Sequence, residues 1–172
     1  IQDVRKQNLS GFKQSGIDFS AAYATATGFG GIDFNVGGTY ILTRASAPTA
    51  VSPFTSELGT FNSRLKVRST LGADIGQFRG QVTWNFSQGF DVPPIGLPQQ
   101  THVGDYNTFD LFFKYDFKQE GAFNNLQLNL TITNVFNQPP PVYYGGALSA
   151  TTGFLNGSTF GRLVQIGFKK KF

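Results

Sequence analysis

Few residues in this chain have the types and spacing that chemistry requires. The chain has no cysteine and one histidine, His102, so composition excludes disulfides, thiolate metal sites and cysteine nucleophiles. No carboxylate cluster or second imidazole accompanies His102, and we recognise no nucleophile with a base and an orienting group. We therefore expect a protein that is not an enzyme, with no catalytic, cofactor-binding or metal-binding residues.

One charged pattern has a spacing with a geometric meaning. Arg64, Lys66 and Arg68 occupy every second position, and alternate side chains of a β-strand point to the same face. In a strand they form a basic stripe that could meet acidic residues of another domain or line the path of an anionic ligand. The competing interpretation is a solvated face whose charges only pair with their neighbours.

Two other groups of residues are candidates for recognition. The segment 138–160 carries Tyr143, Tyr144 and Phe154, which could stack on a ligand or simply pack within a loop. Near the end of the chain, apolar residues alternate with other types, although Lys170 interrupts the alternation. The apolar set is Val164, Ile166, Phe168 and Phe172.

These residues must be positioned by β-strands, because the hydrophobic period is two along most of the chain. Between Leu126 and Ile132, every even position is apolar and every odd position is polar, which gives a strand one apolar and one polar face. The same alternation recurs in six other segments, and no segment is predicted to be helical. The predicted strands are 9–26, 31–46, 61–75, 78–90, 106–117, 125–137 and 161–172.

Short and long connections alternate between these strands. At the two-residue turn formed by Gly76 and Gln77, the hairpin register places Asp74 opposite Arg79 as a pair of opposite charges. Successive turns of an antiparallel sheet lie at opposite ends, so all the long connections are predicted to lie at one end. They are 47–60, 91–105 and 138–160.

Composition narrows the class of protein. Charged residues make up 14% of the 172-residue chain, against about 25% in ordinary soluble domains. Aromatic residues make up 15%, and the net charge is only +4, which argues against a disordered chain or a nucleic-acid-binding arm. No run approaches the roughly 18 apolar residues of a membrane-spanning helix.

Strand length and loop placement favour a membrane protein. Several predicted strands exceed ten residues, whereas ordinary strands have about five or six. Transmembrane barrels combine such strands with short periplasmic turns and long extracellular loops. We therefore predict an antiparallel transmembrane β-barrel fragment of about seven long strands. A soluble all-β domain, with its apolar faces turned inward, is the alternative.

The sequence from Asn134 to Asn137 reads Asn-Val-Phe-Asn. It resembles the Asn–apolar–Phe–Asn element that TonB-dependent outer-membrane receptors often carry in their penultimate strand. The terminal Phe172, preceded by alternating apolar residues, resembles the assembly signal of Gram-negative outer-membrane barrels. The order and spacing of the motifs carry the resemblance over nearly the whole chain. The similar segments are 15–24, 108–117, 128–140 and 161–172.

The resemblance implies that residues 1–172 are the C-terminal portion of a barrel of about 22 strands, without its earlier strands and N-terminal plug. It implies a location in the outer membrane of a Gram-negative bacterium and energised uptake of a scarce ligand, such as a siderophore, a vitamin or a carbohydrate. The implied partners are outer-membrane lipid, the plug and remaining strands, TonB acting through the plug, and the barrel assembly machinery acting on the C-terminal strand. No cofactor and no nucleic acid are implied.

Two alternatives stay open at this point. A porin-like channel fragment would share the strands and loops but lack a plug, and a soluble all-β binding domain would share only the alternation. An odd number of strands also leaves the first and last strands as edges. Their unpaired backbone N–H and C=O groups cannot be exposed to lipid hydrocarbon. We therefore expect the chain to be completed by other strands.

The assembly role of the last residue can be tested in the intact protein. Deletion of Phe172 is expected to lower the amount of protein in the outer membrane while its synthesis continues, because the terminal aromatic is part of the expected signal. Pulse labelling measures synthesis, and surface labelling measures abundance. A Lys171→Gln variant, which keeps the chain length and the terminal aromatic, is the control. Unchanged surface abundance of the deletion variant across expression levels would contradict the role.

Overall fold

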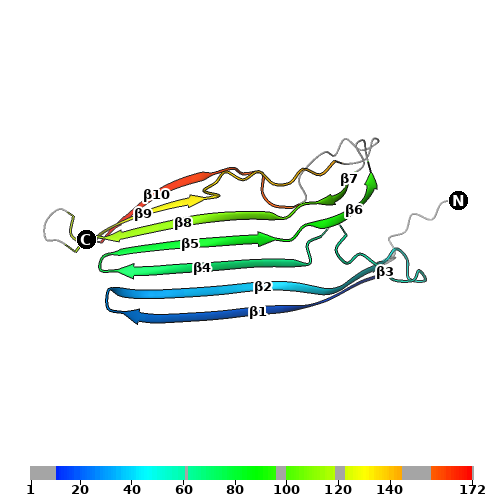
Figure 1. Ribbon diagram of the computed structural model, residues 1–172, viewed down its shortest axis with the longest axis horizontal. Helices are drawn as coiled ribbons and strands as arrows, with labels where there is room; N and C mark the ends of the chain where they lie inside the picture. The colour runs from blue at the N-terminus through cyan, green and yellow to red at the C-terminus, as the bar shows by residue number, and fades with distance from the viewer. Residues whose placement is uncertain (1–10, 61, 96–99, 119–122, 145–155, 172) are drawn as a thin grey trace.

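The fold is one antiparallel sheet (Figure 1). The structure is a computed structural model that describes residues 11–60, 62–95, 100–118, 123–144 and 156–171. Its principal strands are β1 (Gly11–Thr27), β2 (Gly30–Ala47), β4 (Leu65–Ile75), β5 (Phe78–Ser87), β8 (Tyr106–Asp116), β9 (Leu126–Thr133) and β10 (Leu163–Lys170). They lie side by side in this order, which confirms the seven predicted strands.

Three shorter strands lie within the long connections. They are β3 (Thr55–Ser56), β6 (Phe90–Ile95) and β7 (Gln100–Val103). β3 pairs with β2, while β6 and β7 form a separate two-stranded hairpin. The alternation of apolar and polar residues did not predict these three strands. In the described part of the chain every regular element is a strand, and no helix there is long and apolar enough to cross a membrane.

Two predicted strands end earlier than expected, each for a local reason. The prediction for 78–90 was too long, because the ladder stops at Ser87 and the chain from Phe90 onward pairs with β7 instead. The prediction for 125–137 was also too long. β9 ends at Thr133 because Asn134 adopts a left-handed backbone conformation, with φ of 51°, and this conformation does not continue a strand.

The strand register aligns apolar side chains across the whole sheet. Leu71 of β4 lies opposite Phe34 of β2 and Val82 of β5. Because paired residues share a face, one continuous surface results, here called the apolar face. Its residues include Ile17, Phe19, Tyr23, Phe34, Leu71, Val82, Leu111, Phe113, Leu128, Leu130, Ile132, Val164, Ile166 and Phe168.

The opposite surface, here called the polar face, carries the intervening side chains. Thr70 of β4 lies between Asn35 of β2 and Thr83 of β5, and Thr83 lies opposite Asp110 of β8. Phe112 is an aromatic exception on this face, opposite Gln81 and Thr131. Further residues of the polar face are Asp18, Ser20, Arg68, Asn85 and Gln165.

No second layer of the described chain covers either face. The buried hydrophobic residues are Ala47, Phe90, Val92 and Val103, and the last three pack together at the β6–β7 hairpin, outside the principal sheet. On the apolar face Ile166 is 80% exposed, and Leu71, in a central strand, is 54% exposed. The small core therefore belongs to a loop, while the sheet has none of its own.

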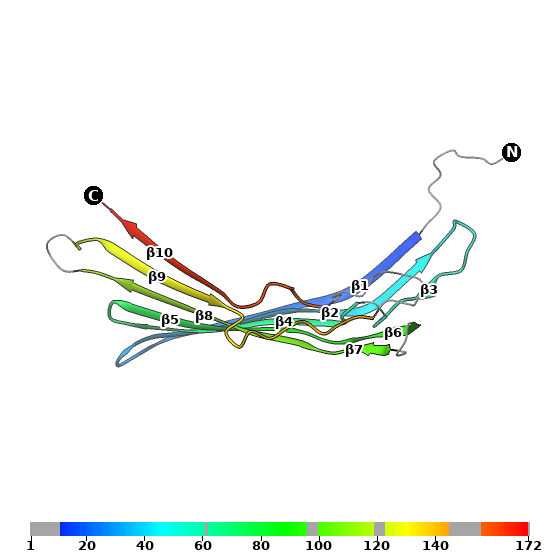
Figure 2. The same ribbon diagram turned by 90° about the horizontal axis from the view of Figure 1, so that it is seen from above.

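The sheet is open, and its two ends differ (Figures 1 and 2). The short β1–β2 and β4–β5 turns, the end of β8 and the start of β9 gather at the end where β10 finishes, and the described parts of the long connections gather at the opposite end, as predicted. β1 and β10 are the outer strands, far apart on opposite sides of the sheet. Figure 2 shows that the sheet is twisted and bowed, the usual consequence of the right-handed twist of each strand.

An ion-pair network links three strands on the polar face. The predicted register is confirmed: Asp74 lies opposite Arg79, and their side chains form an ion pair at 2.5 Å. Arg79 also reaches Asp33 of β2 at 2.8 Å, across the intervening strand. Gly72 leaves room for this contact, since a Cβ there would lie 2.7 Å from the Arg79 Nη2 atom.

A second glycine makes room on the apolar face. Phe19 lies opposite Gly38, and a Cβ at Gly38 would lie 2.5 Å from the Phe19 ring and 2.6 Å from the Lys66 carbonyl oxygen. The ring therefore covers the glycine, an arrangement that compensates for the missing side chain in a strand. The adjacent Gly37 is different, because a Cβ there would make only ordinary contacts at 3.7 Å or more.

The two adjacent glycines give a matched stability test. Gly38→Ala should lower the free energy of unfolding by about 1–3 kcal/mol, because the new methyl group overlaps both a ring and a backbone oxygen. Gly37→Ala should be neutral or stabilising by up to about 1 kcal/mol, because alanine loses less backbone entropy than glycine. Urea midpoints of the folded protein in detergent measure both effects. Equal midpoints for the two variants would contradict the packing argument.

Candidate binding site

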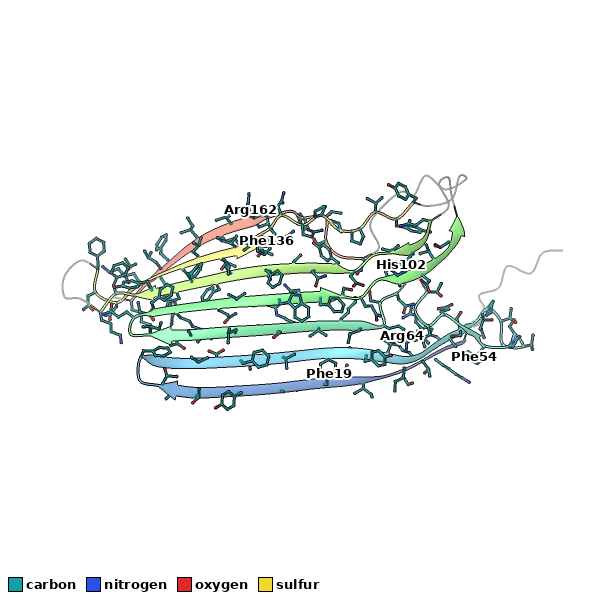
Figure 3. The ribbon with its side chains drawn as sticks, viewed as in Figure 1. Phe19, Phe54, Arg64, His102, Phe136 and Arg162 are labelled. Carbon is teal, nitrogen blue, oxygen red and sulfur yellow. The ribbon has the colours of Figure 1, made fainter. Side chains whose placement is uncertain are left out.

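A cavity opens on the polar face at the end of the long connections. Its volume is about 350 Å³, and it lies where β2, the start of β4 and the β6 segment meet. Figure 3 places Arg64 at this end of the sheet. The lining residues are Thr39, Ile41, Arg44, Asn62, Ser63, Arg64, Lys66 and Phe90. Three of them are cationic and none is acidic, so the cavity suits a negatively charged group.

The two arginines of the cavity are held in place by neighbours. Arg44 extends from β2, donates a hydrogen bond to Gln14 Oε1 at 2.9 Å and lies 3.7 Å from a carboxylate oxygen of Glu57. Arg64 donates from Nη2 to the Tyr40 hydroxyl at 2.7 Å, and its guanidinium lies 5.2 Å from the centroid of that ring. Arginine's planar fork is well suited to bind carboxylate or phosphate oxygens when it is oriented in this way.

Some hydrogen-bonding capacity at the cavity is unused. The Nε atoms of Arg44 and Arg64 and the Oδ1 atom of Asn62 are buried without a hydrogen-bond partner among the described residues. A buried polar group left unpaired costs about 1–3 kcal/mol. The Arg44 Nε atom still lies 3.7 Å from a Glu57 carboxylate oxygen, and Asn62 Oδ1 is an acceptor, so these atoms alone do not select an anionic ligand.

The structure divides the predicted basic stripe. It brings Arg64 and Lys66 to the cavity and leaves Arg68, further along β4, outside the cavity lining. Arg64 precedes β4 and is therefore not part of a regular strand. Sequence reasoning missed Arg44 and Phe90. The polar position of Arg44 near the end of a predicted strand was visible, but its approach to Arg64 depends on the β2–β4 register.

The predicted loop aromatics have separate surroundings. Tyr143 packs against the buried cluster of Phe90, Val92 and Val103, so it has a packing role. Tyr144 is exposed, and its backbone N–H donates to Gln100 Oε1 at 2.8 Å. Phe154 lies outside the described residues.

His102 forms a surface pair, across the β6–β7 hairpin. Its Nδ1 atom lies 3.0 Å from Asp91 Oδ1, and both side chains are largely exposed. The described residues contain no group of three or more histidine, aspartate or glutamate side chains that could hold a metal ion. The geometry gives this histidine one carboxylate neighbour.

The predicted C-terminal signal residues lie along the last strand. Val164, Ile166 and Phe168 all occupy the apolar face, opposite Ile132, Leu130 and Leu128 respectively, and all three are well exposed. Phe172 lies outside the described residues. Lys170, which interrupts the apolar alternation, lies opposite Leu126 at the last ladder position.

The Asn–apolar–Phe–Asn element forms a turn in which each asparagine has a structural role. Asn134 and Asn137 both have left-handed backbones, with φ of 51° and 54°, a conformation that asparagine tolerates better than most residues. The Asn134 amide side chain accepts a hydrogen bond from the Gln138 N–H and donates to the Gln138 carbonyl, both at 2.9 Å. Asn137 Oδ1 accepts from the Arg162 N–H at 2.8 Å.

The aromatic residue of this turn lies at the border of the apolar face. Phe136 packs edge-on against Phe109, with ring centroids 5.7 Å apart, and is 73% exposed. Figure 3 shows Phe136 beside Arg162, at the point where the last connection rejoins the sheet. The turn thus ends β9, anchors the start of β10 and places an aromatic ring at the border of the apolar face.

The comparisons with known proteins give no further guidance. No family model matches the chain, and no curated protein and no solved structure matches it. Function must therefore be inferred from the residues and the geometry of the sheet.

The asparagine turn can be tested by hydrogen exchange. Asn134→Ala removes both side-chain hydrogen bonds and places a less tolerant residue at positive φ, so it should destabilise the turn by about 2–4 kcal/mol. The Gln138 amide is expected to exchange much faster as a result. Gln138→Ala is the matched control, because the bonds from Asn134 use only the backbone of Gln138. Equal amide exchange at position 138 in the two variants would contradict the proposed anchor.

Proposed function

We propose that this chain forms part of the wall of a transmembrane β-barrel in the outer membrane of a Gram-negative bacterium, within a TonB-dependent transporter. In this proposal the apolar face meets lipid and the polar face lines the lumen. Other strands of the same protein would pair with β1 and β10 and close the barrel. The chain would supply wall, lumen surface and outer loops, and would perform no covalent chemistry.

The observation that carries the proposal is the uncovered apolar face. It runs from β1 to β10 without a break, and residues of the central strands, such as Leu71 and Val82, are exposed on it. Soluble monomeric proteins rarely expose a continuous apolar surface of this kind, which is typical of a site of contact with a membrane or another protein. Lipid hydrocarbon is the medium that would cover it while leaving the polar face hydrated, as in the alternation of membrane barrels.

The lengths of the strands and connections support the same proposal. β4, β5 and β8 have 11, 10 and 11 residues, close to the 9–11 residues that cross a bilayer when tilted. Long connections at one end and short turns at the other correspond to the extracellular and periplasmic sides of such barrels. The end with short turns would therefore face the periplasm.

The transporter part of the proposal depends on the family resemblance and on the cavity. The Asn134–Asn137 element and the alternating C-terminal strand resemble the closing strands of TonB-dependent receptors. The cavity with Arg44, Arg64 and Lys66 would lie in the lumen near the extracellular side. This arrangement favours an anionic solute, such as a carboxylate-bearing siderophore, over a neutral sugar. A porin-like channel would share the wall, and a plug domain elsewhere in the protein would distinguish the transporter from it.

Site-directed labelling tests which face meets lipid. Leu130 and Thr131 are adjacent on β9 and occupy opposite faces, because Leu130 lies between Phe113 and Ile166 while Thr131 lies between Phe112 and Gln165. The chain has no cysteine, so an introduced cysteine is the only one in this part of the protein. In membranes, a spin label at position 130 should respond to a lipid-soluble quencher, and one at 131 should respond less.

Charge substitutions at the same positions provide the matched stability test. Leu130→Arg should sharply reduce the folded protein in the outer membrane, because an outward arginine near the bilayer midplane costs about 2–4 kcal/mol. Thr131→Arg should be far milder, because a lumen arginine is solvated. A soluble sandwich also predicts damage from Leu130→Arg, so the label decides between them. Protection of position 130 from both lipid-soluble and water-soluble quenchers would place it in a protein core and refute the membrane proposal.

A further inference from the structure

A second cavity adjoins the first on the polar face. Its volume is about 360 Å³, and it lies over the middle of β1, β2 and β4. Thr39 and Lys66 line both cavities, so the two are neighbours that share one ammonium group. In Figure 1, β4 runs from the long connections toward the short turns, which places Arg68 deeper along the sheet than Lys66. The lining residues are Asp18, Gly37, Gly38, Thr39, Lys66, Val67 and Arg68.

The charged residues of this cavity lie on one face of the sheet. Asp18 lies opposite Thr39, and Thr39 lies opposite Lys66 on the other side. Arg68 lies opposite Gly37 of β2, two positions further along the same strand as Lys66. Because paired residues and alternate residues of a strand share a face, all of these side chains belong to the polar face.

The two cations of this cavity differ from other basic residues of the polar face. Within the described residues, Lys66 and Arg68 take part in no ion pair. Other cations of the same face are matched by carboxylates on their own or neighbouring strands. These pairs are Arg44 with Glu57, Arg79 with Asp33 and Asp74, and Lys114 with Asp116.

The nearby carboxylates are engaged elsewhere. Asp18, the one acidic residue that lines the cavity, accepts a hydrogen bond from the Thr39 hydroxyl at 2.6 Å. Beyond Arg68, Asp110 of β8 accepts from Asn85 Nδ2 at 2.8 Å and from the Asn134 N–H at 2.9 Å. The cavity therefore has two cations and one carboxylate, and the described residues leave positive charge in excess.

Gly37 provides open space between these charges. It lies between Ser20 of β1 and Arg68 of β4, and a Cβ there would approach no other atom more closely than 3.7 Å. The spaces at Gly38 and Gly72 are filled by Phe19 and Arg79, as described above, whereas no side chain fills the space at Gly37. A glycine inside a strand often marks a place where a ligand approaches the backbone closely.

We propose that this second cavity binds a carboxylate group of a small organic anion and forms a second site on the path of the solute. The carboxylate oxygens would lie between Lys66 and Arg68, and the body of the solute would lie over Gly37. Alternate positions of a strand are about 6–7 Å apart, so an anion could pass from the first cavity to the second while it stays near Lys66. The inference rests on the proposed function, because it takes the polar face to line the lumen.

A row of sites suits passage better than one strong site. A solute must bind well enough to enter a pore and weakly enough to leave each site. The first cavity holds Arg44, Arg64 and Lys66, and the second holds Lys66 and Arg68. The shared lysine would let one cavity release the anion as the other accepts it. The competing occupant is an acidic segment of the same protein.

The test places a thiol at the proposed site in the intact protein that contains this chain, inserted into lipid vesicles. The chain has no cysteine, and Gly37→Cys is accommodated because its Cβ has room. The thiol is treated with methanethiosulfonate reagents that carry a sulfonate or a trimethylammonium group. Arg68→Gln should lower the ratio of the anionic to the cationic rate about threefold to fivefold at low ionic strength, because a unit charge about 7 Å away attracts one reagent and repels the other.

Protection by a dicarboxylate measures binding at the same position. Millimolar glutarate should slow the reaction of the thiol in a saturable way at constant ionic strength, and the uncharged glutaramide should not. Arg68→Gln should weaken this protection by about the same factor, threefold to fivefold. Lys169→Gln is the matched control, because it removes one charge from the polar face at the other end of the sheet, opposite Gln127. It should retain both the rate ratio and the protection.

The outcomes separate this inference from the proposed function. Full protection in Arg68→Gln would place glutarate in the first cavity alone and refute the second site. A thiol that reacts with neither reagent would show that a protein segment fills the cavity, and equal effects of Arg68→Gln and Lys169→Gln would show only overall charge. Each result refutes the second site. The membrane wall is tested by the label at position 130: quenching from lipid without glutarate protection refutes this inference alone, and shielding from lipid refutes both.

Discussion

The structure depends on one constraint: a single sheet with an apolar face needs a second apolar partner. In ordinary all-β domains that partner is another sheet or a layer of helices, and the two together enclose a core. Here the described chain provides only the small cluster of Phe90, Val92 and Val103, at the β6–β7 hairpin. The free energy available from burying the apolar face must therefore come from outside the described chain.

The polar face shows how a sheet without a core is held in register. Backbone ladders fix neighbouring strands. Arg79 of β5 pairs with Asp74 on the adjacent β4 and also reaches Asp33 on β2, two strand spacings away, across Gly72. On the other face, the Phe19 ring lies over Gly38. In each case a glycine provides space that a side chain from a neighbouring strand fills. The packing that specifies the sheet is therefore lateral, between strands in one plane.

The sequence was sufficient to predict the principal strands because alternation and turn residues are local features of the chain. Alternation predicted seven strands, and the turn at Gly76 and Gln77 predicted the pairing of Asp74 with Arg79, which the ladder confirms. The additional strands escaped prediction because β6 contains two prolines and β3 only two residues. The cavity was not predicted for a different reason. Arg44 and Arg64 are distant in sequence, and only the β2–β4 register brings them to the same cavity. The expected transport, membrane location and partners remain predictions.

The asparagine turn has a consequence for how this protein can change. Asn137 accepts a hydrogen bond from the backbone N–H of Arg162, so the two residues that begin and end the last long connection are joined to each other. Arg162 reinforces this link by donating from Nη1 to the Val135 carbonyl at 3.3 Å. Because these hydrogen bonds fix the two ends, a change in the length of the segment between them has a small entropic cost. β9 and β10 can keep their register when the connection changes. Selection can therefore alter the length of this connection without displacing the two strands that it joins.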